Sequence, residues 1–258
     1  MPSTTEEAAR QRFPRGLNQP EGSFRFSVDA LLLAAFAPGA RASAFADLGT
    51  GCGVVGLALC LEHTHLSGIG LESDSRLIEA ARLNAAMLGL EQRFSPIAHD
   101  LAEPITQLPG QVDLVTANPP WQKPKSGKAP ETAMRTRALV DSGNSLAVFC
   151  AAAFRLLPHK GSLACVYDSA GLVGLLETLR KERLEPKRVR FVHSRARSAA
   201  RLVLVEARKG SRPGLAVEDP LVLYEPLEQG GNPRGFTRQA LAYCPFLACN
   251  SGQYLSLK

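Results

Sequence analysis

Four consecutive residues could hold a planar amine for reaction: Asn118-Pro119-Pro120-Trp121, which follow the apolar run 112–117. The two prolines remove two backbone N–H donors, so nearby carbonyl oxygens lack local partners. An asparagine oxygen and one such carbonyl can accept both hydrogens of an exocyclic –NH2 group, while an aromatic ring stacks on the group that carries it. This arrangement suits methylation of an amine or amide nitrogen, because positioning suffices when the methyl donor is already activated. The alternative is an ordinary turn with a surface tryptophan.

A glycine-rich stretch is the second motif, Asp47-Leu48-Gly49-Thr50-Gly51-Cys52-Gly53, between the apolar run 44–46 and the apolar segment 54–61. Glycines allow positive φ and close approach of a ligand, and the free N–H groups of a following helix face the turn. We therefore expect a cofactor loop. Gly51-x-Gly53-x-x-Gly56, with Glu72 about twenty residues on, also matches the dinucleotide fingerprint, so a nicotinamide oxidoreductase is a rival. The early opening of the loop at Asp47 and the Asn-Pro-Pro-Trp motif disfavour hydride transfer.

Strands alternating with helices must position these motifs. The patterns predict strands over 43–48, 66–72, 94–100, 112–117 and 162–167, with helices over 53–62, 74–88, 142–157 and 169–183. Two last strands, 187–193 and 201–207, are expected to form an antiparallel edge pair. The predicted fold is α/β: a Rossmann-like, seven-stranded, mostly parallel sheet with helices on both faces and an antiparallel C-terminal edge pair. In such sheets the strand ends converge on one crevice, here carrying the glycine loop, Glu72, Asp100 and Asn118.

The remaining segments divide the chain into three parts. Residues 1–22 are expected to form a loosely ordered basic arm, because prolines and glycines interrupt them. Residues 23–209 form the catalytic domain, which opens with a short apolar helix capped by Ser27. Residues 210–258 are a C-terminal extension that either packs on the sheet edge or is mobile.

Composition limits the compartment and the partners. The net charge is +6, and residues 180–212 hold twelve Lys and Arg against three acids. Such crowding predicts contacts with RNA phosphates, the alternative being a solvated surface. Residues 1–19 contain no apolar signal segment, and the longest apolar run, 30–37, is too short to span a membrane. Six cysteines without a CxxC pair predict free thiols, no metal and, by elimination, a cytoplasmic protein.

The motifs resemble those of a known family. The glycine loop, Glu72, Asp100 and Asn118-Pro119-Pro120-Trp121 are similar in order to the motifs of Rossmann-like S-adenosylmethionine-dependent methyltransferases. Segments 24–34, 185–193 and 202–210 resemble the bacterial tRNA1(Val) (adenine(37)-N6)-methyltransferase family, and the resemblance covers about residues 13–225. The family usually has Tyr or Phe where Trp121 stands.

The resemblance implies S-adenosyl-L-methionine as the cofactor. The glycines would cradle its methionine part, with Asp47 ordering the loop or meeting the amine through water. Glu72 would accept the ribose hydroxyls, unless it is only a surface acid, and Asp100 would bond the adenine, unless it caps a helix. Asp29, with Arg25, would close over the carboxypropyl end or cap a helix. The implied cofactor residues are thus Asp29, Asp47, Gly49, Gly51, Gly53, Glu72 and Asp100, and the implied catalytic residues are Asn118, Pro119, Pro120 and Trp121.

These patterns together predict an S-adenosylmethionine-dependent N6-adenine methyltransferase acting on RNA, with tRNA favoured as the substrate. Two alternatives remain besides the oxidoreductase: a glutamine N5-methyltransferase acting on a release factor, and a non-catalytic RNA-binding protein with this fold. A monomer is favoured. The expected RNA contacts are Lys123, Lys125, Arg188, Arg190 and Arg195, within the wider stretches 122–141 and 188–201.

Overall fold

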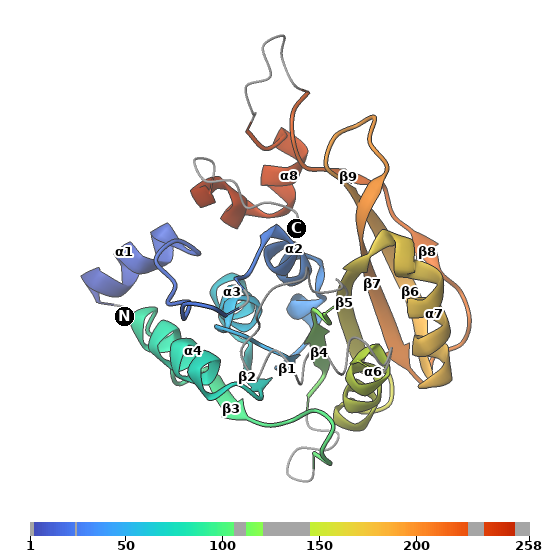
Figure 1. Cartoon of the computed structure of the whole chain (residues 1–258), viewed down its shortest axis with the longest axis horizontal. Coiled ribbons are helices and arrows are strands. Elements are labelled where there is room, and N and C mark those ends of the chain that lie inside the picture. Colours follow the sequence, from blue (N-terminus) through green and yellow to red (C-terminus); the bar gives the residue numbers. More distant parts are fainter. Residues whose placement is uncertain (1–2, 24, 106–111, 121–144, 227–234, 251–258) are drawn as a thin grey trace.

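The computed structural model describes residues 3–23, 25–105, 112–120, 145–226 and 235–250, which surround one central sheet (Figure 1). Within these residues the sheet has nine strands in the order β3-β2-β1-β4-β5-β7-β6-β8, with β9 also paired to β6. The two short strands β8 and β9 extend the predicted seven. The α/β fold class, with its mostly parallel sheet and antiparallel C-terminal edge pair, is confirmed.

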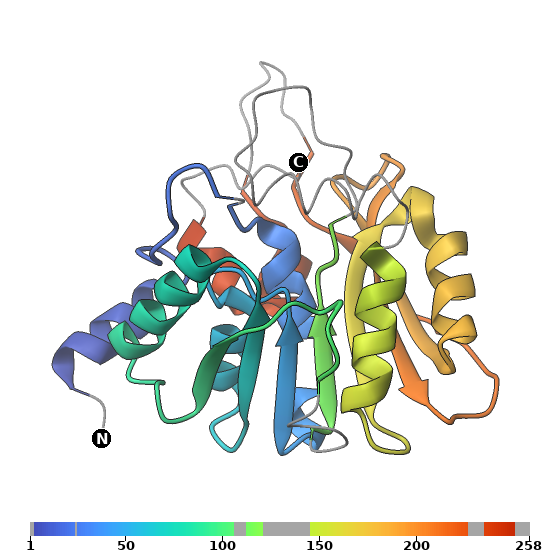
Figure 2. The same cartoon turned by 60° about the horizontal axis from the view of Figure 1, so that its bottom comes forward.

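Five parallel strands form the half of the sheet that carries the chemical motifs. They are β1 (Ala44–Leu48), β2 (Ser67–Glu72), β3 (Phe94–Ala98), β4 (Leu114–Ala117) and β5 (Ser162–Asp168). The chain builds outwards from β1 to β3 and then returns to place β4 on the other side of β1. Strand order therefore reverses between β1 and β4, the point beside which open α/β sheets bind their ligands. Figure 2 shows the carboxyl ends of these strands at the top.

Helices cover both faces of the sheet, as predicted. One buried cluster contains residues of α2 (Val28–Phe36), α3 (Val54–Glu62) and α4 (Ser75–Met87). The other contains residues of α6 (Ser145–Leu156) and α7 (Leu172–Lys181), which follows the short 3-10 turn η2 (Ser169–Gly171). A second 3-10 turn, η1 (Gly39–Arg41), joins α2 to β1. The apolar spacing of each segment thus predicted the helices to within a few residues.

The antiparallel pair is β6 (Leu184–His193) and β7 (Ala200–Lys209). β7 lies between β5 and β6 and runs antiparallel to both, so β6 runs parallel to β5. The turn 194–199 therefore lies at the same edge of the sheet as the carboxyl ends of β1 and β4.

The two ends of the chain are more structured than predicted. The expectation of a loosely ordered arm is wrong for residues 4–12, which form α1 (Thr4–Arg12) with a capping box between Ser3 and Glu6. Arg10 donates to the carbonyl of Leu88 at the end of α4, which docks α1 there. The open question about residues after 210 is settled for the described part, which packs on the sheet and on α2. It forms β8 (Ala216–Val217), β9 (Leu221–Val222), α8 (Arg238–Tyr243) and the 3-10 helix η3 (Pro245–Asn250).

The division into 1–22, 23–209 and 210–258 stays a prediction.

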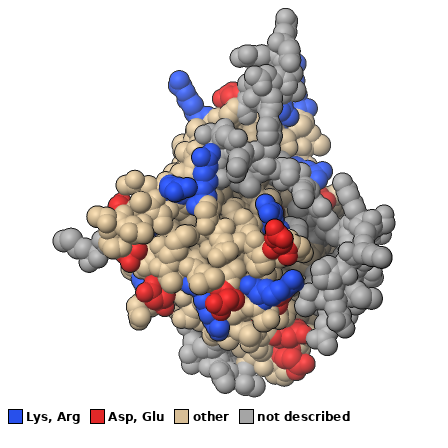
Figure 3. Space-filling view, turned by 60° about the vertical axis from the view of Figure 1, so that its left-hand side comes forward, with Lys and Arg blue, Asp and Glu red and all other residues tan. Residues whose placement is uncertain are grey.

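On the face near α1 and α4, Figure 3 shows acidic and basic side chains interspersed. None of the helices in the described ranges is long and apolar enough to cross a membrane.

Candidate active site

The glycine loop lies directly after β1 and in front of α3. Gly49, Gly51 and Gly53 all have positive φ, at +64°, +57° and +89°. The amides of Gly49 and Thr50 both donate to the carbonyl of Leu71 in β2, which ties the loop to the neighbouring strand. Gly53 is the N-cap of α3 in the left-handed conformation. Non-glycine residues would strain the backbone at each position, which explains the residue type.

The space around Gly51 shows whether a cofactor can approach this loop. A Cβ built on Gly51 would meet no atom of the described residues within 4 Å, whereas one on Gly53 would approach Phe94 at 3.0 Å. Packing within the protein therefore explains the missing side chain at Gly53, while Gly51 faces open space at the strand ends. A ligand can approach the backbone there, so the loop fits the predicted cofactor.

Asp47 is buried beneath the loop and satisfied by the protein. Its carboxylate accepts hydrogen bonds from the hydroxyls of Thr50, at 2.6 Å, and Thr116, at 2.7 Å. Burial raises the pKa of Asp47 to about 6, against the lowering effect of these two bonds. The geometry favours the first of the two predicted roles, ordering of the loop. Sequence reasoning missed Thr116, although a hydroxyl within the buried run 112–117 requires a partner.

Glu72 faces the loop from the end of β2. One carboxylate oxygen accepts from the amide of Gly51 at 3.1 Å, and the other from the amides of Ser73 and Asp74 at 2.8 and 3.1 Å. The carboxylate is thus fixed beside the open position at Gly51. Its predicted contact with ribose hydroxyls stays a prediction that this placement supports.

Asp100 has a more local task in the structure. It is exposed, and its carboxylate accepts from the amide of Ala102 at 3.0 Å, which stabilises the turn after β3. A contact with the cofactor adenine stays a prediction.

Asn118 lies at the end of β4, half-buried, and is followed by the buried Pro119 and the half-buried Pro120. Its side-chain amide donates to the carboxylate of Asp29 at 3.5 Å. Asp29 is 4% exposed and stands in the first turn of α2. The structure therefore brings together two predicted site residues that are 89 positions apart. Trp121, Lys123 and Lys125 lie outside the described residues.

The strand-end carboxyl groups have no basic partner among the described residues. No ion pair between these residues involves Asp29, Asp47 or Glu72, whose partners are hydroxyl and amide groups. Burial raises the pKa of Asp29 as well as that of Asp47, which disfavours their charged forms.

Cys52 is also buried. Burial raises the pKa of its thiol to about 12 and makes it a poor nucleophile.

Arg188 and Arg190, predicted to bind phosphates, are bound within the protein. Arg188 donates to Glu206, to Glu218 and to the carbonyl of Phe36, at 2.9, 3.0 and 2.6 Å. Arg190 donates to Glu218 at 2.7 Å and lies over the ring of Tyr243. The structure thus corrects the prediction for this pair: their donors are used within the protein, where they join β6 to β7, to α2 and to Glu218. Arg195, in contrast, lies in the turn 194–199, at the same edge of the sheet as the carboxyl ends of β1 and β4.

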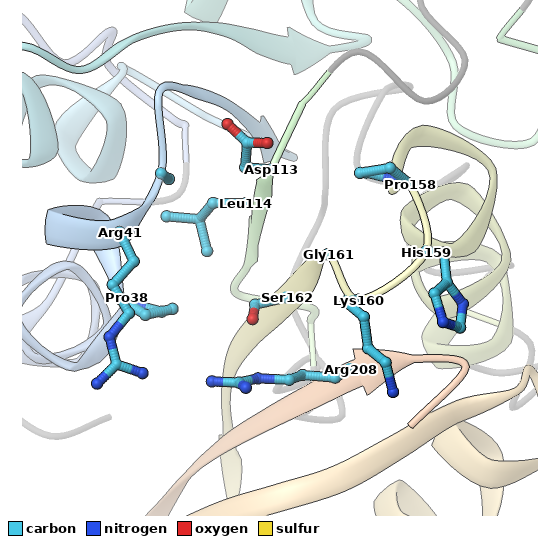
Figure 4. A pocket seen from close by; sticks show the side chains of 11 residues that line it. Pro38, Arg41, Asp113, Leu114, Pro158, His159, Lys160, Gly161, Ser162 and Arg208 are labelled. Carbon is cyan, nitrogen blue, oxygen red and sulfur yellow. The ribbon is translucent and has the colours of Figure 1, made fainter. Parts of the chain in front are cut away.

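A hollow of about 320 Å³ lies elsewhere, at the amino ends of β4 and β5 (Figure 4). Three of its charged lining residues have partners within the protein: Arg208 pairs with Glu206, Lys160 donates to Gly210, and Asp113 accepts from Ser43. This hollow is separate from the strand-end site.

Comparison with known proteins identifies the family. The model of the family described as "methyltransferase small domain" matches residues 27–170, more than half of the chain. The chain belongs to this family. Its cofactor is accordingly S-adenosylmethionine, as the resemblance of the motifs implies.

Two relatives differ in what they modify. A tRNA1(Val) (adenine(37)-N6)-methyltransferase of Parabacteroides distasonis is 28% identical over 185 residues, which cover 71% of this chain and 76% of the relative. A release factor glutamine methyltransferase of Agrobacterium fabrum is 41% identical over 75 residues, but these cover 29% of this chain and only 25% of the relative. A solved structure of a predicted O-methyltransferase from Agrobacterium tumefaciens has a TM-score of 0.66 and 20% identity, covering 85% of this chain and 96% of that one, which confirms the fold.

Proposed function

We propose that this protein is an S-adenosylmethionine-dependent N6-adenine methyltransferase that acts on RNA, with tRNA as the favoured substrate. The observation that carries the proposal is the position of Asn118 and Pro119, at the end of β4 and next to the strand-order reversal. A substrate amine placed there would lie next to the glycine loop at the end of β1, because β1 and β4 are paired neighbours.

Each part of the site has a distinct task in this proposal. When bound, S-adenosylmethionine supplies an activated methyl group. Gly49, Gly51 and Gly53 line its methionine part, and Glu72 accepts its ribose hydroxyls. Oδ1 of Asn118 and the carbonyl oxygen of Pro119 accept hydrogen bonds from the two N–H groups of the amine. These bonds fix the nitrogen in place and raise its electron density. Stacking of the base on Trp121 remains part of the prediction.

Two observations favour RNA over a protein substrate. The similarity to the tRNA-modifying relative extends over 185 residues and thus beyond the segment 27–170, whereas the similarity to release factor glutamine methyltransferases spans 75 residues in one relative and 144 in another. In addition, Arg195 and Arg197 lie in the turn 194–199, at the same edge of the sheet as the carboxyl ends of β1 and β4, and Arg201 follows in β7. Arg197 and Arg201 are exposed, as groups that bind phosphates must be.

The test is methyl transfer from labelled S-adenosylmethionine into tRNA, rRNA and release factor, followed by digestion to nucleosides or amino acids. The proposal expects label as N6-methyladenosine in tRNA. Asn118→Ala should reduce the rate about 10²- to 10³-fold, the typical effect of removing one polar group that stabilises a transition state. Thr178→Ala, which changes a hydroxyl within α7, is the control and should leave the rate unchanged.

Other outcomes would identify the alternatives. Label in glutamine of a release factor would replace the RNA substrate with a protein, through the same Asn-Pro-Pro geometry. Cofactor binding without label in any of these substrates would favour a non-catalytic RNA-binding protein.

A further inference from the structure

The carboxylate of Asp29 lies between the start of α2 and the amide of Asn118. One of its oxygens accepts from the hydroxyl of Ser27 and the other from Nδ2 of Asn118. The side chain is almost fully buried, and it belongs to a helix in which eight of nine residues are buried. The position of this carboxylate is therefore fixed by packing.

This contact determines which way the amide of Asn118 faces. The –NH2 end of the amide faces Asp29, because Nδ2 of Asn118 donates to a carboxyl oxygen of that residue. The oxygen must then face away from Asp29, and no donor among the described residues occupies it. In the opposite orientation, two oxygens would face each other in a buried site, which is unfavourable.

We propose that Asp29 is a positioning residue that orients the Asn118 amide so that Oδ1 faces the substrate amine. This inference rests on the proposed role of Asn118 and assigns Asp29 a task other than holding the cofactor. It also differs from simple helix capping: Ser27, the N-cap residue of α2, makes no capping bond and donates its hydroxyl to Asp29 instead.

A double-mutant cycle tests whether Asp29 acts through Asn118. Asp29→Ala should lower kcat about 10- to 100-fold, because the hydrogen bond that orients the Asn118 amide is lost. In an Asn118→Ala background the same change should lower kcat less than about twofold, because there is no amide to orient. Asp29→Asn should have an intermediate effect, since an amide can face Asn118 with either end.

Cofactor binding separates positioning from a cofactor contact. Titration calorimetry should show the same Kd for S-adenosylmethionine, within about twofold, in the wild type and in Asp29→Asn. Thr237→Ala, which removes the cap of α8, controls for loss of a helix cap and should lower thermal stability with unchanged kcat. A Kd raised tenfold with unchanged kcat, or additive effects in the cycle, would overturn the proposal.

An NMR measurement keeps the inference independent of activity. The side-chain –NH2 signals of Asn118, assigned by their loss in Asn118→Ala, should shift in Asp29→Asn and stay in place in Thr237→Ala. Unshifted signals in a folded Asp29→Asn variant would refute the contact. If the wild type labels glutamine rather than adenine, the RNA proposal fails, and the cycle is measured on that substrate, where the same orientation is required.

Discussion

Two polar clusters in this protein satisfy their carboxyl groups in different ways. In the cluster at the strand ends, Asp29 and Asp47 accept from hydroxyl and amide donors, and burial raises the pKa of both. In the cluster on β6, Glu206 is paired with Arg188 and Arg208, and Glu218 with Arg188 and Arg190.

The difference predicts different consequences when each cluster is altered. Two glutamates paired with three arginines form a salt-bridge network that joins β6 to β7 and to the segment after β8. The aspartates at the strand ends have hydroxyl and amide partners, and burial disfavours their charged forms. Breaking the first cluster should therefore cost folding free energy, and replacing Asp47 in the second should change the pH dependence of stability.

The largest expected effect is on the β6 cluster. Arg188→Ala should lower the free energy of unfolding by about 3 kcal/mol, because Glu206, 3% exposed, loses one of two charged partners. Denaturant unfolding measures this loss, and the Kd for S-adenosylmethionine should be unchanged. Arg180→Ala is the matched control: Arg180 is 63% exposed in its pair with Glu185 and should contribute less than about 1 kcal/mol. Equal losses in the two variants would contradict the comparison.

Replacing Asp47 should have the opposite effect on stability and raise the free energy of unfolding. Its pKa is about 6 in the folded protein and ordinary when unfolded, so the folded state binds the proton more tightly. Stability should therefore fall as the pH rises from about 4 to about 6, and Asp47→Asn should remove this slope and gain roughly 1–2 kcal/mol at pH 8. Unfolding curves from pH 4 to pH 8 check this, and parallel curves for the two proteins would show that Asp47 carries no such cost.

A substitution at Gly51 should distinguish loss of cofactor affinity from loss of stability through backbone strain. Gly51→Ala places a methyl group in the open space at the loop, and we expect the affinity for S-adenosylmethionine to fall at least about tenfold, equivalent to about 1.4 kcal/mol. Gly89→Ala is the control, because Gly89 has a similar φ of +62° at the end of α4, where only the Glu6 side chain must shift. Both variants should lose about 1–2 kcal/mol of stability, but only the first should bind the cofactor more weakly. Weaker binding in both would point to a general effect of unfolding.

The smallest effect concerns the arginines that the β6 cluster leaves exposed. Changing Arg197 and Arg201 to Glu should lower the slope of log affinity for tRNA against log salt by about one unit for each phosphate that the variant no longer binds. Lys181→Glu, an exposed site at the opposite edge, should leave the slope unchanged. If Arg188→Ala lowered the slope and the turn variants did not, RNA contacts would have to be placed on β6 instead.

The alternation of apolar runs and turn residues predicted most of the elements that position the site. The strand ends at Gly49, Glu72 and Asn118 could be located because apolar periodicity changes to polar or special residues there. The prediction was wrong for α1. The prolines and glycines after residue 13 indicated an irregular arm, whereas Ser3 and Glu6 form a capping box that begins a helix.

Local periodicity and the rules of parallel sheets are enough to predict the fold class, the order of the motifs and their convergence on one edge. Which charged side chains are already paired within the protein follows from the folded chain. Arg188 and Arg197 are equally basic in the sequence. In the folded chain, however, Arg188 is paired with Glu206, 18 positions away, and with Glu218, 30 positions away. The contact of Asp29 with Asn118 likewise joins residues 89 positions apart. Pairing of charges depends on distances across the folded chain, and no local pattern encodes them.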